Sequence, residues 1–189
     1  MLDMNIFGLY GDSMMTVFER KEMFKKAMGY VQKYGTRDPF IISVGCGAHV
    51  IFKYDFKKLM GMYSVGERRR NIFVNGNLPD EEQRMSCGHE LGHDSNPRHR
   101  KIAQKCAMRD TSLFVRNTTD YEADLFCSHI LLDEDIILEY MKEGYELDHI
   151  AAAMNVYEEL LLIKLEDMNQ RGLPVRAAYI PIINFWKRP

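Results

Sequence analysis

The chain has 189 residues, a length typical of one folded domain. Hydrophobic residues make up 46% of the chain and charged residues 28%, which excludes a disordered protein. The net charge of −2 offers no basic surplus for a polyanion, and no apolar run reaches the roughly 18 residues of a membrane span. We therefore expect a cytoplasmic protein that contacts neither nucleic acid nor membranes directly.

The N-terminal part combines one helix with short strands. Ser13 predicts the start of a helix that ends near residue 35, and the pair Asp38-Pro39 breaks the chain before a strand over residues 40–44. Two more short strands, at residues 60–65 and 71–75, are joined by a hairpin-like connection. We expect these strands to form a small antiparallel sheet.

From Asp80 onward the pattern is helical. Asp80 and Gln83 resemble a capping arrangement at the start of a helix that Pro97 ends. A second helix opens at Thr118 or Thr119. Shorter helices are predicted over residues 135–142, 147–154 and 157–170.

The order of these elements, strands first and helices after, predicts an α+β fold. No repeat or polar linker divides the chain, so we expect a single domain over residues 1–189. Within it, residues 1–132 would form the catalytic core and residues 133–189 a helical C-terminal extension.

The motif CGHELGHD at residues 87–94 points to metal chemistry. On a helix, positions i and i+4 differ by about 40° in direction, so His89 and His93 can bind one ion, for which we expect Zn2+. The ion would lower the pKa of a bound water to about 7 and polarise the scissile carbonyl. Glu90, at the edge of the same face, can take the proton as a general base. The alternative is an amphipathic helix with two surface histidines.

A third ligand must come from elsewhere in the chain. His99 lies ten residues after His89, where the H-E-x-x-H-x-x-G-x-x-H pattern has its last histidine. The other option is a carboxylate on the second helix, where Asp120 and Asp124 share a face while Glu122 is about 160° away from it. We favour Asp120 as the ligand and Asp124 as the acid that orients a ligand histidine, with His99 and Glu122 as alternatives.

The helix–helix distance follows from the same residues. Gly92 costs about 1 kcal/mol inside a helix, which indicates close packing at that position. Asp120 is shorter than a glutamate, so the two helices must approach closely for it to reach the ion. The four cysteines show no C-x-x-C spacing and are expected to be free thiols.

Three ordered stretches, RMSCGHELGHD, DYEADLFCSHILLDED and GYELDHIAAAMNVYEELLLIKL, resemble the ImmA/IrrE family of zinc metallopeptidases over about residues 60–165. The resemblance implies a zincin-like fold with small sheet, metal-binding helix and helical C-terminal part. The family has E-x-E-A-N/D at the second stretch, and Asp120 stands where its ligand glutamate is expected. His99 would be a displaced version of a histidine that the family carries soon after its second ligand.

The resemblance further implies a site-specific endopeptidase, encoded by a mobile element or a stress-response locus, that cleaves a helix-turn-helix transcriptional repressor. The alternative function is a non-hydrolytic, metal-stabilised module that docks a repressor or another partner. A fourth protein ligand closing the metal site would favour the module. Residues 144–165 superficially resemble a helix-turn-helix themselves, but their acidic exposed positions favour docking of a protein over contact with DNA.

Overall fold

The computed structural model describes residues 15–111, 117–173 and 175, and within them the chain forms eight helices and four strands. The helices are α1 (Val17–Tyr34), α2 (Pro39–Gly45), α3 (Asp80–Ser95), α4 (Pro97–Ala103), α5 (Thr118–Leu131), α6 (Glu134–Glu143), α7 (Leu147–Ala153) and α8 (Glu158–Gln170). The strands are β1 (His49–Lys53), β2 (Gly61–Val65), β3 (Arg70–Asn75) and β4 (Met108–Asp110). The α+β class is confirmed, and so are the two metal-motif helices and the three shorter helices after them.

The sheet has the order β1-β3-β2-β4. The hairpin of β2 and β3 is antiparallel as predicted, with Tyr63 opposite Ile72. β4 also pairs antiparallel to β2, with Asp110 opposite Gly61. β1, however, runs parallel to β3, so the sheet is mixed and the prediction of a purely antiparallel sheet is wrong in this respect.

The predicted strand at residues 40–44 is helix α2. Pro39 occupies the first turn, where its fixed φ suits a helix, and the Asp38 side chain accepts a hydrogen bond from the Phe40 N–H at 2.8 Å. Ile42 is buried, whereas Val44 is exposed. The short apolar run therefore has one buried helical face, a case in which periodicity alone does not separate helix from strand.

The N-terminal capping residues of three helices differ from the predicted ones. Ser13 lies outside the described residues, and α1 is capped by Thr16. At the start of α3, Gln83 donates to the Leu78 carbonyl instead of forming a capping box. The N-cap of α5 is Asn117, one residue before the two threonines that were predicted, and its side chain accepts from the backbone of the third helical residue.

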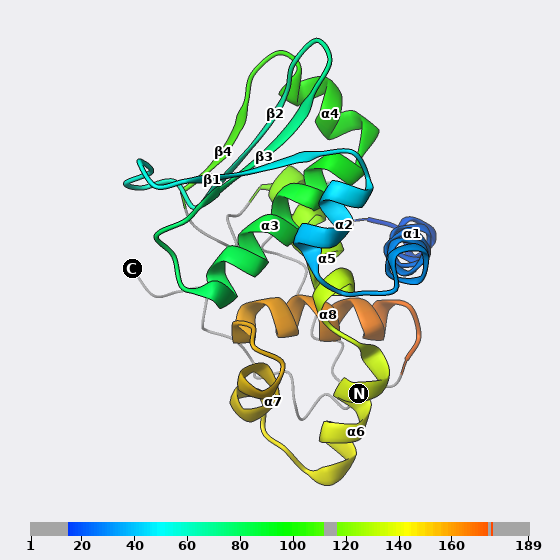
Figure 1. Cartoon of the computed structure of the whole chain (residues 1–189). Helices are drawn as coiled ribbons and strands as arrows, with labels where there is room; N and C mark the ends of the chain where they lie inside the picture. Colours follow the sequence, from blue (N-terminus) through cyan, green and yellow to red (C-terminus); the bar gives the residue numbers. More distant parts are fainter. Residues whose placement is uncertain (1–14, 112–116, 174, 176–189) are drawn as a thin grey trace.

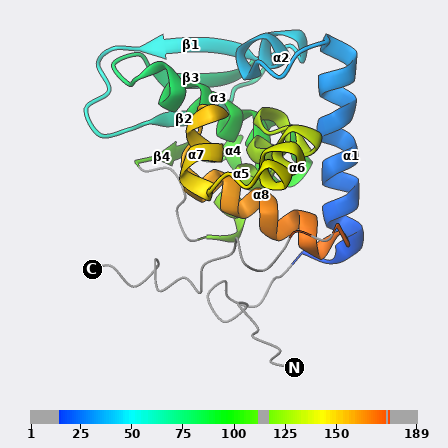
Figure 2. The ribbon, with the colours of Figure 1, turned by 90° about the horizontal axis from the view of Figure 1, so that it is seen from below.

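The elements form layers that place α3 at the centre (Figure 1). α3 runs along one face of the sheet and packs most extensively on α5, which in turn contacts α1 and α8. Seen from below, α1 stands along one side of the molecule and α6 and α7 overlie α8 (Figure 2). Side chains from the sheet and from α3, α5 and α8 fill the main core, among them Tyr63, Ile72, Leu91, Ile130 and Leu161. None of the helices in the described ranges is long and apolar enough to cross a bilayer.

A buried charged network joins α8 to α5. The Lys164 ammonium lies 2.8 Å from the Glu134 carboxylate and 2.9 Å from His129 Nδ1. Asp167 pairs with Arg20 of α1 at 3.3 Å. His129, at the far end of α5 from the metal motif, is thus a core histidine. The four cysteines are free.

Candidate metal centre

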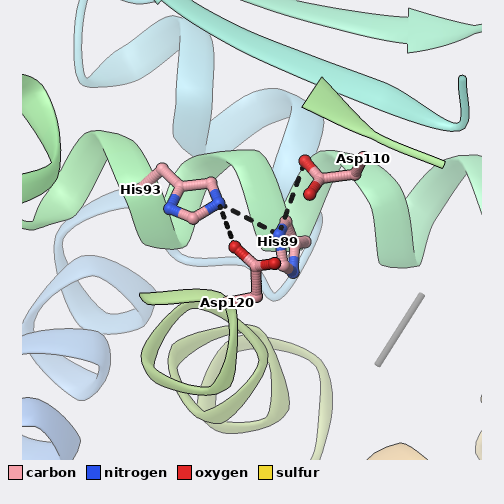
Figure 3. Close-up of side chains that lie close together, drawn as sticks. All are labelled: His89, His93, Asp110 and Asp120. Carbon is pink, nitrogen blue, oxygen red and sulfur yellow. Dashed lines mark hydrogen bonds and ion pairs between the residues drawn. The ribbon is translucent and has the colours of Figure 1, made fainter. Parts of the chain in front are cut away.

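Helix α3 presents two histidines to one point. The Nε2 atoms of His89 and His93 lie 3.0 Å apart, as expected for residues one helical turn from each other (Figure 3). The end of α3 is fixed to the sheet through the buried Asp94, which accepts hydrogen bonds from the Tyr63 hydroxyl at 2.7 Å and from Arg70 at 2.5 Å. The histidine pair therefore has a rigid position relative to β2 and β3.

Helix α5 adds the two predicted aspartates. Asp120 Oδ1 lies 3.7 Å from His93 Nε2, while Asn117 donates to the other oxygen at 2.5 Å. Asp124, one turn further on, accepts a hydrogen bond from His89 Nδ1 at 2.7 Å. Each aspartate thus faces one histidine of α3, and the structure brings together all the residues chosen from the sequence.

The close approach of α3 and α5 rests on glycines. A Cβ atom added to Gly92 would lie 2.6 Å from the Ala123 carbonyl oxygen and 2.7 Å from Ala123 Cα. One added to Gly88 would lie 2.6 Å from Cys127 Sγ. The prediction that Gly92 marks close packing is confirmed, and this approach lets the short side chain of Asp120 reach the histidines.

Strand β4 supplies a carboxylate that the sequence did not reveal. Asp110 Oδ2 lies 3.6 Å from His89 Nε2, and one donor atom from each of His89, His93, Asp110 and Asp120 lies within 4.8 Å of the others. Figure 3 shows Asp110 at the end of β4, on the side of the histidines opposite to α5. A strand of three residues has too little alternation to be recognised, so no sequence signal pointed to this residue.

The carboxylate of Glu90 is buried beside this cluster. Its oxygens have no hydrogen-bond partner in the part of the chain that the structure describes. Gly61 of β2 makes room for it, because a Cβ atom at that position would collide with Glu90 Oε1. An unpartnered buried carboxylate is costly, and a neighbouring cation together with a water molecule would satisfy it.

His99 and Glu122 lie outside the cluster, behind His93. His99 Nε2 donates to Glu122 Oε2 at 3.1 Å, so in a neutral imidazole Nδ1 of His99 is an acceptor. Nδ1 of His93 lies 3.1 Å from that atom and can donate to it, which leaves Nε2 of His93 with a free lone pair. Asp124 likewise accepts a hydrogen bond from Nδ1 of His89, which leaves Nε2 of His89 with a free lone pair. These contacts select the tautomers that a metal ion requires.

The charges of the cluster favour a cation. Burial lowers the pKa of His89, but the carboxylates of Asp124 and Asp110 outweigh it and raise that pKa well above its ordinary value. Burial and the charge of His89 lower the pKa of His93. Burial raises the pKa of Glu90, and the charge of Asp110 raises it further. The carboxylates thus stabilise positive charge at His89, where a metal ion and a proton would compete.

The donor set fits zinc. Zinc binds imidazole and carboxylate at about 2.0–2.2 Å in a tetrahedron, so neighbouring ligand atoms are separated by about 3.3–3.6 Å. The separations of 3.0 Å between the two histidine Nε2 atoms and 3.7 Å between His93 Nε2 and Asp120 Oδ1 lie on either side of this value. His89, His93 and Asp120 are therefore suited to hold a zinc ion, with Glu90 next to it.

Comparison with known proteins agrees with this geometry. Residues 47–166, more than half of the chain, match the model of a peptidase family described as the IrrE N-terminal-like domain. The chain is also similar to a protein of Bacillus phage phi105 named uncharacterized immunity region protein 2, with 30% identity over 135 residues that cover 71% of this chain and 83% of that protein. The chain therefore belongs to the IrrE N-terminal-like family of peptidases.

Proposed function

We propose that the protein is a zinc-dependent endopeptidase. In this proposal His89, His93 and Asp120 hold the ion, Glu90 is the general base and Asp124 orients His89. The observation that supports it best is the Glu90 carboxylate, which is buried and unpartnered directly beside a cluster of metal-binding side chains. Membership of a peptidase family supports the same reaction class.

The chain's own residues provide the proton transfers of peptide hydrolysis. Held by His89, His93 and Asp120, a zinc ion would supply the activation of water and the polarisation of the scissile carbonyl. Glu90 takes the proton of the attacking water and delivers it to the leaving amine. Burial raises the pKa of Glu90, which makes its carboxylate a stronger proton acceptor. Asp124 and His99 hold the two histidines in the required tautomers throughout.

For the substrate we propose a helix-turn-helix transcriptional repressor, cleaved in the cytoplasm at one site. The resemblance to the ImmA/IrrE family supports this substrate, and the similar phage protein is named for an immunity region. The near-neutral charge of the chain is compatible with a peptidase that acts on a DNA-binding protein without binding DNA itself.

The test compares wild type with Glu90→Gln, using the helix-turn-helix repressor encoded nearest to the gene for this chain. Wild type loaded with zinc should cut the repressor at one site, seen by intact-mass spectrometry. Glu90→Gln should bind one zinc ion per chain and lose at least about 100-fold in cleavage rate. Cleavage by Glu90→Gln at the wild-type rate would refute the mechanism. Cleavage of a peptide library but not of the repressor would refute only the substrate.

One observation favours the second candidate, a metal-stabilised docking module. Asp110 brings a fourth protein donor to the cluster, and structural zinc sites have four protein ligands. The module gives no role to the buried carboxylate of Glu90, which is why we favour the peptidase. In the experiment above, a module would show no cleavage by wild type, and removal of zinc would lower its melting temperature and its binding of the partner together.

A further inference from the structure

The position of Asp110 bears on how the site opens. Its Oδ2 lies 3.6 Å from Nε2 of His89, and Asp120 Oδ1 lies 3.7 Å from Nε2 of His93. The two carboxylates thus stand equally close to the histidine pair and approach it from different elements, β4 and α5 (Figure 3). By these distances Asp110 is as well placed to bind the ion as Asp120 is.

The surroundings of Asp110 also point to a ligand. Its side chain is only 8% exposed, and within the described ranges its Oδ2 has no hydrogen-bond partner. Asp120 differs, because Asn117 holds one of its oxygens. The ion-pair partner of this oxygen, His89, lies 3.6 Å away, beyond hydrogen-bond distance, and a metal ion at the histidine pair would compensate the buried charge at closer range.

The backbone of Asp110 is held while its side chain faces the cluster. The Met60 N–H donates to the Asp110 carbonyl at 2.8 Å, and Asp110 pairs with Gly61 across the β2–β4 ladder. β4 is three residues long and lies at the edge of the sheet. A short edge strand has only one neighbouring strand to keep it in place, so it is the element of this site that can shift most easily.

We propose that Asp110 is a fourth protein ligand of the metal ion in the resting protein and that it must leave the ion before a peptide is cleaved. This rests on the proposed function for the cleavage step alone. Two imidazoles and two carboxylates complete a tetrahedral shell, which excludes solvent and small ligands from the ion. Release of Asp110 opens one position while His89, His93 and Asp120 retain the ion. The resting enzyme is thus closed, and an extended substrate that displaces the end of β4 would open it.

The experiment loads full-length protein with Co2+ and measures its absorption spectrum with and without azide. In wild type the closed shell should exclude azide and the spectrum should stay unchanged. In Asp110→Asn azide should shift the spectrum, and the affinity for zinc should fall at least about 10-fold in chelator competition. Asp55→Asn, an aspartate in an exposed loop, is the matched control and should behave as wild type.

Asp110→Glu keeps the carboxylate and should again exclude azide. This variant shows whether the effect of Asp110→Asn comes from loss of the carboxylate or from misfolding. The inference is overturned if azide shifts the wild-type spectrum as strongly as that of Asp110→Asn, or if both proteins bind zinc equally well. Repressor cleavage per bound zinc should rise in Asp110→Asn. If the metal measurements follow Asp110 but no protein cleaves any peptide, the peptidase proposal fails and the fourth ligand stands. If wild type binds no metal, both fail.

Discussion

Replacing Gly92 with alanine tests whether the approach of α3 to α5 creates the site. The new Cβ atom would lie 2.6 Å from the Ala123 carbonyl oxygen and 2.7 Å from Ala123 Cα. Ordinary contacts of this kind begin at about 3.4 Å, so the two helices must separate by several tenths of an ångström. Because the obstacle is backbone, no side-chain rotation relieves the collision.

The expected magnitude combines two opposing effects. Overpacking costs about 1–3 kcal/mol, and a rigid obstacle calls for the upper part of that range. Alanine gains about 1 kcal/mol over glycine in helix propensity. The free energy of unfolding should therefore fall by about 2 kcal/mol, which lowers the melting temperature by about 4–8 °C for a chain of this size.

Gly29→Ala is the matched control. Gly29 also lies inside a helix, α1, but a Cβ atom there would meet nothing within 4 Å. This variant should be about 1 kcal/mol more stable than wild type. Thermal unfolding of both metal-free proteins and zinc affinity by chelator competition are the assays. Gly92→Ala should also bind zinc more weakly, since Asp120 moves away from the histidines. A Gly92→Ala protein as stable as Gly29→Ala, with wild-type zinc affinity, would show that the site does not depend on the close approach of α3 to α5.

Two further predictions concern buried charges. Asp124→Asn removes the charge that faces His89 Nδ1 at 2.7 Å, so zinc affinity should fall about 10–100-fold in chelator competition; an unchanged affinity would show that this contact does not support the ion. Burial lowers the pKa of Lys164 to about 8 from its ordinary 10.5. Between these values the unfolded chain binds more protons than the folded one, so stability rises with pH. Relative to Lys164→Met, wild type should gain up to about 3 kcal/mol in free energy of unfolding across this range in chemical denaturation, and a constant difference would contradict it.

The helices of the site could be predicted because their signals are local. The pair His89 and His93 lies one turn apart in a segment bounded by proline, and the second motif opens a helix with its two aspartates on one face. The fold around these helices was harder to predict from the sequence. The apolar run of α2 is compatible with helix or strand. Strand β1, the parallel partner of β3, does not alternate between buried and exposed residues and therefore gives no strand signal.

Asp110 shows where sequence reasoning reaches its limit. Its place at the cluster depends on pairing between β4 and β2, which lie more than 40 residues apart in the chain. Neither the length of β4, three residues, nor its composition predicts a strand. Gly92, by contrast, was informative because a glycine inside a helix has a local cost that only close packing explains.

We propose that α3 and α5 together hold a metal ion beside Glu90. The most direct test is a crystal structure of the zinc-soaked protein with anomalous data at the zinc edge. We expect one ion within about 2.0–2.2 Å of Nε2 of His89, Nε2 of His93 and a carboxylate oxygen of Asp120. An anomalous peak at another place, or none at these side chains with zinc in excess, would contradict it.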